Sequence, residues 1–144
     1  MGGTIDKVYP QKPNAYGFEI RDAKSIEILN RWENQVEYEF HTIAQKDSQD
    51  LTAEDSENLL SFISSHAANA FLITHGTDTI GTTGKYLKER LSNFAVPIVL
   101  TGSRLPASVL GSDAALNIGM SSGVIQSQET GVYIVLDGIV RELK

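Results

Sequence analysis

The chain has 144 residues, of which 41% are hydrophobic and 21% charged, a composition typical of one globular domain. Its 18 acidic residues outweigh 12 basic ones, and no basic cluster is interleaved with aromatic residues, which argues against nucleic acid as a partner. The sequence has no cysteine and its three histidines lack the spacing of a zinc-binding pair, so a thiolate or zinc site is not expected.

The amino-terminal half predicts two helices with one strand between them. A short helix is expected around Ser25–Trp32, and Gln35–Ala44 alternates partly with a period of two, which predicts a strand. Thr52 followed by Asp55 is typical of a capping box, so the second helix is expected to begin there and to end near His66.

The remainder of the chain alternates apolar runs with helical patterns. The runs Ala70–Thr74, Pro97–Thr101 and Gly131–Leu136 predict strands that are buried on both faces. Apolar residues at helical spacing from Ile80 to Leu91 predict a helix between the first two runs, and Ser112–Gln126 predicts another between the last two.

This βαβαβαβ order predicts an α/β fold. Right-handed crossovers between parallel strands would place helices on both faces of a mainly parallel sheet, giving a doubly wound α/β/α sandwich of three layers, of the flavodoxin or Rossmann kind. Residues 1–144 are expected to form one domain. No apolar run approaches the ~20 residues that span a bilayer and no leader pattern is present, so we expect a cytoplasmic protein without membrane contact.

In such sheets ligands bind at the carboxyl ends of the strands, which selects three loops. They follow Ala44, Ile73 and Leu100 and read QKDSQD, THGTDT and TGSRLPAS. All are rich in hydroxyls, carboxylates or glycine, and none has the glycine spacing that holds a nucleotide phosphate.

Thr77 and Asp78 are the first candidates for chemistry. They adjoin where a strand runs into a helix, so a hydroxyl would lie beside backbone N–H groups and a carboxylate near the positive end of the helix dipole. Gly76 would allow a close backbone approach. Local chemistry leaves open the alternative that Thr77 and Asp78 only cap the helix.

Two further sets of residues are weaker candidates for catalysis. His75 is expected to be a packed or solvent-bridged side chain rather than a base. A Ser/His/Asp triad with Ser103 or Ser112 can be drawn, but neither serine lies in a GxSxG turn.

Four motifs together carry a more specific signal: GGTI at 2–5, SQD at 48–50, THGTDT at 74–79, and LTGSRLPAS followed by SDAALN within 100–117. In order and spacing they resemble the amino-terminal domain of the bacterial type I/II L-asparaginase family. The resemblance implies an amidohydrolase that converts L-asparagine to L-aspartate and ammonia without a metal or organic cofactor. Glutamine and related amides remain open, because one methylene changes discrimination by only ~1–3 kcal/mol.

The resemblance also implies individual roles. Thr4 matches the nucleophile on a mobile loop, and Thr77 with Asp78 matches the second reactive pair, in which Asp78 would also hold the α-amino group of the substrate. Tyr16 matches a loop tyrosine that contacts the nucleophile, with Tyr9 as the alternative. The predicted catalytic residues are therefore Thr4, Thr77, Asp78 and Tyr16, and the predicted substrate-binding residues are Ser48, Gln49 and Gly76.

The sequence departs from the family pattern in three places. Members have a hydrophobic strand that leads into the GGT loop, whereas Met1 stands here, so we expect a sheet that lacks the usual first strand and a nucleophile loop without its anchor. We hypothesise that the natural chain starts further upstream or that another segment fills the strand position. The family's lysine is expected beyond Lys144, and the carboxy-terminal domain is absent.

These departures keep other functions open. A non-catalytic amino-acid-binding or assembly module is the main alternative, and a structural α/β module is another. A sheet that lacks an edge element would expose unpaired backbone groups, so a homo-oligomer, most simply a dimer, is predicted.

Overall fold

The computed structural model describes residues 1–11, 17–31, 36–91, 93, 95–128 and 130–144. Its main sheet has four strands in the order β3-β4-β5-β6. The parallel strands β3 (Phe71–Thr74), β4 (Pro97–Thr101) and β5 (Gly131–Leu136) coincide with the three apolar runs, so these predictions are confirmed. The fourth strand, β6 (Ile139–Glu142), pairs antiparallel with β5 and was not predicted.

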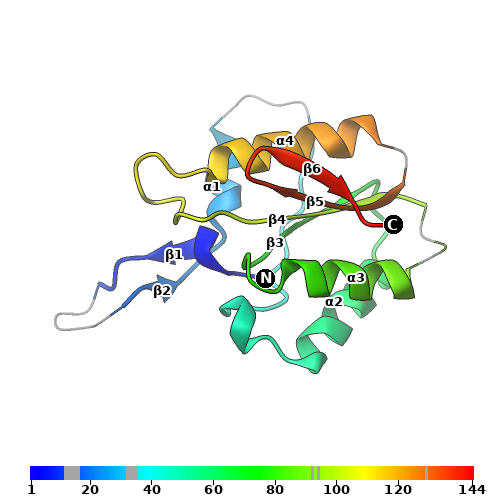
Figure 1. Cartoon of the computed structure of the whole chain (residues 1–144), viewed down its shortest axis with the longest axis horizontal. Coiled ribbons are helices and arrows are strands. Elements are labelled where there is room, and N and C mark those ends of the chain that lie inside the picture. Colours follow the sequence, from blue (N-terminus) through cyan, green and yellow to red (C-terminus); the bar gives the residue numbers. More distant parts are fainter. Residues whose placement is uncertain (12–16, 32–35, 92, 94, 129) are drawn as a thin grey trace.

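Helices cover both faces of this sheet, which confirms the predicted α/β sandwich (Figure 1). The helices α2 (Ala53–Ser65) and α3 (Ile80–Arg90) lie on one face. The helices α1 (Lys24–Asn30) and α4 (Ala114–Ser127) lie on the other. None of the helices within the described ranges is long and apolar enough to cross a membrane.

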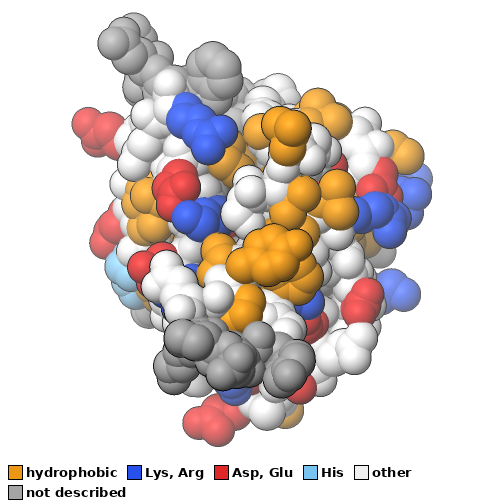
Figure 2. Space-filling model, turned by 90° about the vertical axis from the view of Figure 1, so that its left-hand side faces the viewer, with side chains coloured by type: hydrophobic (Ala, Val, Ile, Leu, Met, Phe, Trp, Pro, Cys, Tyr) orange, Lys and Arg blue, Asp and Glu red, His pale blue; other side chains and the backbone are white. Residues whose placement is uncertain are grey.

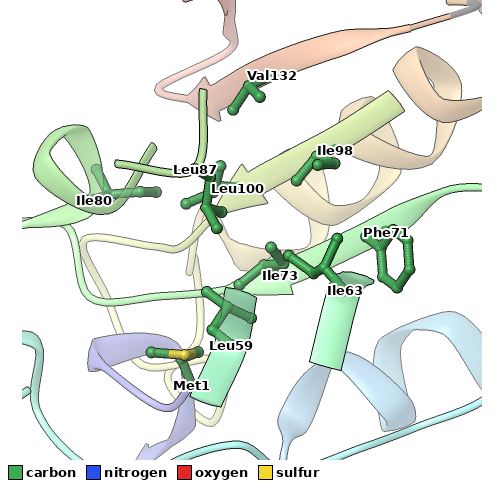
Figure 3. Packing of buried hydrophobic residues seen from close by; sticks show 10 residues of the cluster. All are labelled: Met1, Leu59, Ile63, Phe71, Ile73, Ile80, Leu87, Ile98, Leu100 and Val132. Atoms are coloured by element: carbon green, nitrogen blue, oxygen red, sulfur yellow. The ribbon is translucent and has the colours of Figure 1, made fainter. Parts of the chain in front are cut away.

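Successive residues of β4 point to opposite faces, and this alternation divides the core. Ile98 and Leu100 are fully buried against Leu87 of α3 and Ile63 of α2 (Figure 3). Val99, between them, packs with residues of α4 on the other face. Because β4 is buried on both sides, its sequence is apolar without alternation.

The two crossovers of the sheet have opposite hands. β3, β4 and β5 are parallel and follow one another across the sheet, so two right-handed connections would place both helices on one face. Instead, α3 and α4 pack on opposite faces. One of the two connections is therefore left-handed, and the sequence-based expectation of uniformly right-handed crossovers is wrong.

The start of α2 is fixed by the predicted capping box. The Asp55 backbone N–H donates to Thr52 Oγ1 at 3.3 Å, and the Thr52 N–H donates to Asp55 Oδ2 at 2.8 Å. Lys46 adds an ion pair to the same carboxylate at 2.8 Å. These contacts hold the carboxylate ionised and lower the pKa of Asp55 to about 2, with the bond from Lys46 as the largest cause.

The predicted strand at Gln35–Ala44 is wrong, since its described residues, 36–44, form no strand. The aromatic side chains of this segment pack on helices instead. The Tyr38 hydroxyl lies 2.8 Å from Ser122 Oγ of α4, and the His41 ring lies 4.6 Å from the Phe62 ring of α2. The period-two pattern therefore reflects packing against two layers rather than pairing with β3.

Short elements that were not predicted surround the amino terminus. The 3-10 turn η1 (Thr4–Asp6) leads into a hairpin of β1 (Lys7–Val8) and β2 (Glu19–Ile20). A second 3-10 turn, η2 (Ser48–Asp50), precedes α2. Figure 2 shows that hydrophobic side chains gather on the face of the molecule that carries the hairpin.

Candidate functional site

Nearly all of the predicted site residues converge on one cavity of about 350 Å³. Its lining comes from the segment around η1, from η2 with the residue before it, and from the loop after β3. Six of the seven predicted residues line it, and three were not predicted: Thr4, Ser48, Gln49, Gly76, Thr77 and Asp78, with Lys7, Asp47 and Asp50 in addition.

Of the two tyrosine candidates, only Tyr9 lies within the described residues. Tyr16 lies outside the residues that the structure describes. Tyr9 is 74% exposed on the hairpin, where its ring packs 5.0 Å from the ring of Phe18, and it does not line the cavity. The alternative assignment to Tyr9 therefore gains no support.

The floor of the cavity is formed by close backbone contacts. Gly3 adopts φ 94°, and a Cβ atom on it would overlap the backbone nitrogen of Gly76. A Cβ atom on Gly76 would in turn lie 2.5 Å from Ser48 Oγ. Glycine at both positions is what allows the three segments to meet.

The segment that carries Thr4 is held by several bonds, although no strand leads into it in the described chain. Gly2 forms a parallel bridge with Lys46, and the Gly3 N–H donates to the Lys46 carbonyl at 3.1 Å. Ile5 is fully buried and accepts a bond from the Ala107 N–H at 3.1 Å. These bonds hold the Thr4 segment against Lys46 and against the loop after β4.

Asp6, at the end of η1, adds a buried carboxylate to this anchor. It accepts a hydrogen bond from the Lys24 N–H at 2.7 Å, which ties η1 to the start of α1. Burial raises the pKa of the Asp6 carboxyl, and the Lys24 bond opposes part of that shift.

Asp78 and Gln49 join two of the loops directly. Gln49 Nε2 donates to Asp78 Oδ2 at 2.5 Å, and the Thr79 hydroxyl donates to the Ser48 carbonyl at 3.0 Å. Thr79 is the N-cap residue of α3, and no side-chain cap hydrogen bond is formed there among the described residues. The alternative that Thr77 and Asp78 are capping residues is therefore not supported.

Ser48 presents a hydrogen-bonding group that the described residues leave unused. The residue is 3% exposed, and its Oγ atom has no hydrogen-bond partner in the part of the chain that the structure describes. A buried hydroxyl without a partner is unfavourable by ~1–3 kcal/mol. Because Ser48 lines the cavity, a polar ligand there would supply the missing partner.

His75 is buried and neutral, as expected for a packed side chain. Burial lowers its pKa. Nδ1 lies 2.8 Å from the Gly76 carbonyl and Nε2 lies 2.9 Å from Thr83 Oγ1, so the first nitrogen donates and the second accepts. Both ring nitrogens are thus engaged in holding the loop after β3.

The loop after β4 supports the site from behind rather than lining it. A Cβ atom on Gly102 would overlap the His75 carbonyl oxygen, so the two loops touch through their backbones. Ser103 and Ser112 both donate to the Leu105 carbonyl, at 2.6 and 2.9 Å. With His75 engaged elsewhere, a Ser/His/Asp triad is not formed.

The cavity is acidic, with three carboxylates and one ammonium group in its lining. Lys7 Nζ lies 2.6 Å from Asp47 Oδ2, and this bond lowers the pKa of Asp47. No cluster of three potential metal ligands occurs among the described residues. Asp47 could have been found as the residue before SQD, Asp50 as the last residue of that motif, and Lys7 as the residue three positions after Thr4.

Comparisons with known proteins identify the family of this chain. The family model of the asparaginase amino-terminal domain matches residues 1–142. L-asparaginase of Thermococcus kodakarensis is 28% identical over 135 residues, which are 92% of this chain and 41% of that protein. L-asparaginase 1 of Escherichia coli K12 is 38% identical over 74 residues, 50% of this chain and 22% of that protein.

Solved structures show the same fold. The thermostable L-asparaginase from Thermococcus kodakarensis superposes with a TM-score of 0.79 at 29% identity, covering 93% of this chain and 41% of that one. L-asparaginase I from Vibrio cholerae gives a TM-score of 0.81 at 22% identity, covering 98% and 44%. The chain thus spans less than half the length of these relatives. It belongs to the asparaginase family, of which it represents the amino-terminal domain.

Proposed function

We propose that this chain carries an asparaginase-like amidohydrolase site that hydrolyses the side-chain amide of L-asparagine through a threonine nucleophile. The observation that supports it best is the single cavity in which Thr4, Thr77 and Asp78 meet the polar residues Ser48 and Gln49. Family membership supports the reaction class. The T. kodakarensis and E. coli relatives are described as L-asparaginases.

In the proposed reaction, Thr4 Oγ attacks the amide carbon of the substrate. The hydroxyl proton passes to the leaving nitrogen, ammonia departs, and an acyl ester with Thr4 remains. Water then attacks the ester carbon, which releases L-aspartate and returns the proton to Thr4. Thr77 and Asp78 would organise the proton transfers, and the N–H groups near the start of α3 would favour the developing negative charge.

The other polar residues of the cavity would bind the α-amino and α-carboxylate groups of the substrate. Asp78 is a carboxylate already held by Gln49, and it would pair with the α-amino group. The Ser48 hydroxyl has an unfilled hydrogen bond and would donate to the α-carboxylate. Gly76, which admits the Ser48 side chain, would leave room for the substrate backbone.

Ammonia release from L-asparagine tests the proposal. We expect measurable release by the wild-type chain, and loss of about a hundredfold or more in both Thr4→Ala and Thr77→Ala, because each removes a group required in the transition state. Thr82→Ala is the matched control, since Thr82 is an exposed threonine on α3 outside the cavity. Release that persists in both cavity variants would overturn the threonine mechanism.

The second candidate is an amino-acid-binding module without turnover. It is favoured by the Ser48 hydroxyl without a hydrogen-bond partner among the described residues, because a bound ligand alone, without any reaction, would supply that partner. Thermal stabilisation by L-asparagine or L-aspartate without ammonia release would establish it. Rates of ammonia release from L-asparagine and from L-glutamine would show which amide is the better substrate.

The cytoplasmic location and the dimer stay predictions.

A further inference from the structure

Lys7 is the one cation among the described residues that line the cavity, and its partner Asp47 belongs to a different segment. Lys7 begins β1, directly after the turn that carries Thr4. Asp47 precedes Ser48 and is the N-cap residue of η2. The ion pair therefore connects the segment of the proposed nucleophile to the segment of the proposed substrate-binding residues.

Backbone bonds beside the ion pair also fix the positions of the two segments that it joins. Asp47 is extended at φ −66° and ψ 150°, and its carbonyl accepts the Asp50 N–H at 3.0 Å, so it fixes the start and the end of η2. One residue away, the Lys46 carbonyl accepts the Gly3 N–H at 3.1 Å. Contacts on both sides of Thr4 thus hold the two segments together.

The Lys7–Asp47 pair is more buried than the Arg90–Glu57 pair on the surface. The Lys7 and Asp47 side chains are 25% and 31% exposed, against 55% for each partner of the Arg90–Glu57 pair. The Lys7–Asp47 bond is also the shorter, at 2.6 Å against 3.8 Å. Partly buried pairs are screened less by solvent and salt.

We propose that Lys7 is a positioning residue of this site, whose ion pair with Asp47 holds the Ser48–Gln49 turn against the Thr4 segment in the geometry that binds the amino acid. This role rests on the proposed function, because it concerns the same cavity. Lys7 acts through Asp47, and the pair also neutralises one of the three carboxylates of an acidic site. An anionic α-carboxylate can then approach Ser48.

Four variants and one control test the pair: Lys7→Met, Asp47→Asn, the double variant, Lys7→Arg, and Arg90→Met. We expect each single neutral variant to raise KM for L-asparagine by about ten- to a hundredfold with a smaller change in kcat, because substrate-binding groups are misplaced. The double variant should match the single ones, since one interaction is lost in each. Lys7→Arg should restore KM, and Arg90→Met should leave it unchanged.

Two kinetic outcomes would overturn the proposal. If only Lys7→Met raises KM while Asp47→Asn does not, Lys7 contacts the ligand directly. If the losses of the two single variants multiply in the double variant, the residues act independently. If a neutral variant loses the folded state by circular dichroism, Lys7→Arg, which keeps the positive charge, still tests the ion pair in a folded protein.

A second measurement does not depend on turnover. Amide hydrogen exchange in the ligand-free protein should become faster at Ser48–Asp50 in Lys7→Met and Asp47→Asn, and stay unchanged there in Arg90→Met. If the wild-type chain neither releases ammonia nor binds L-aspartate, the proposed function fails while the exchange result still decides the role of the pair. If amide exchange at Ser48–Asp50 is unchanged in both Lys7→Met and Asp47→Asn, the positioning role is overturned even if the wild-type chain is active.

Discussion

At the scale of single residues, two serines that are almost equally buried have opposite hydrogen-bonding states. Ser48 Oγ lacks a partner among the described residues, whereas Ser121 Oγ donates to the Asn117 carbonyl at 2.7 Å. Both side chains are nearly inaccessible, so the difference does not come from solvent. In the proposed function, the Ser48 hydroxyl would be a group retained for binding at the expense of stability.

We predict that Ser48→Ala raises the free energy of unfolding of the ligand-free protein, by up to about 1–3 kcal/mol, because it removes a buried hydroxyl without a partner. Ser121→Ala should lower that free energy, since it removes a hydrogen bond that is formed. Urea unfolding measures both. In the same series, Ser48→Ala should abolish the thermal shift caused by L-aspartate, and a lower stability of ligand-free Ser48→Ala would contradict this account.

At the scale of elements, α2 is held at its first turn by an unusual number of contacts with Asp55. The carboxylate accepts bonds from Lys46 and from the backbone and hydroxyl of Thr52. Lys46 is also the residue whose carbonyl binds Gly3. The start of α2 is therefore coupled to the floor of the cavity through one lysine.

This coupling predicts a stability change in acid. The pKa of Asp55 is about 2 in the folded chain, below its ordinary value of 3.8, so the folded state binds this proton less readily than the unfolded state. The contribution is fully present above pH ~4 and is lost as the pH falls towards ~2. Melting temperatures between pH 6 and pH 2 should therefore converge for wild type and Asp55→Asn in acid.

A control on the same turn makes this prediction specific. Glu54 is an exposed acidic residue in the first turn of α2, and Glu54→Gln removes a carboxylate from the same end of the helix. Glu54→Gln should follow the wild-type melting curve more closely than Asp55→Asn does. A constant difference between wild type and Asp55→Asn at every pH would contradict the assignment of the acid transition to Asp55.

At the scale of the whole molecule, the two edges of the main sheet differ. Beside β3, the segment from Val36 to Gln45 lines a second cavity of about 940 Å³ together with α1 and α2. At the opposite edge, all four residues of β6 are exposed, including the apolar Ile139 and Val140. The open edge expected from the sequence concerned the position of the usual first strand, so the exposed strand β6 is a different edge that the sequence did not predict.

We predict that self-association, if driven by this edge, depends on β6. An exposed apolar edge strand is a template for pairing, and a lysine within it disfavours such pairing. Val140→Lys should lower the apparent mass at micromolar concentration in sedimentation velocity. Leu110→Lys is the control, because Leu110 is fully exposed but lies in the loop after β4. A wild-type monomer at all concentrations would contradict the predicted dimer.

The sequence predicted those parts of the fold that depend on local patterns. The three apolar runs became β3, β4 and β5 because strands buried on both faces need uninterrupted apolar residues. The rule that ligands bind at the carboxyl ends of strands correctly selected the loop after β3. It also selected the segment after Ala44, which lines the cavity but does not follow a strand. Family motifs supplied Thr4, which composition and periodicity alone would not have selected.

The failures arise where distant contacts decide the outcome. Tyr38 and His41 alternate like strand residues, yet they pack on α4 and α2. The hand of each crossover depends on which face a helix covers, and this information is not in any local window. Asp137-Gly138, which forms the β5–β6 turn with positive φ at both residues, was a local signal that was overlooked.

The glycine contacts beneath the cavity limit how this protein can be redesigned. Gly3, Gly76 and Gly102 each face a neighbouring backbone or side chain at a distance that leaves no space for a methyl group. A mutagenesis library aimed at a new substrate should therefore keep these three codons constant. Diversity belongs at Asp50, an exposed residue of the lining, where a changed side chain alters the charge of the cavity and keeps the backbone bond from the Asp50 N–H to the Asp47 carbonyl.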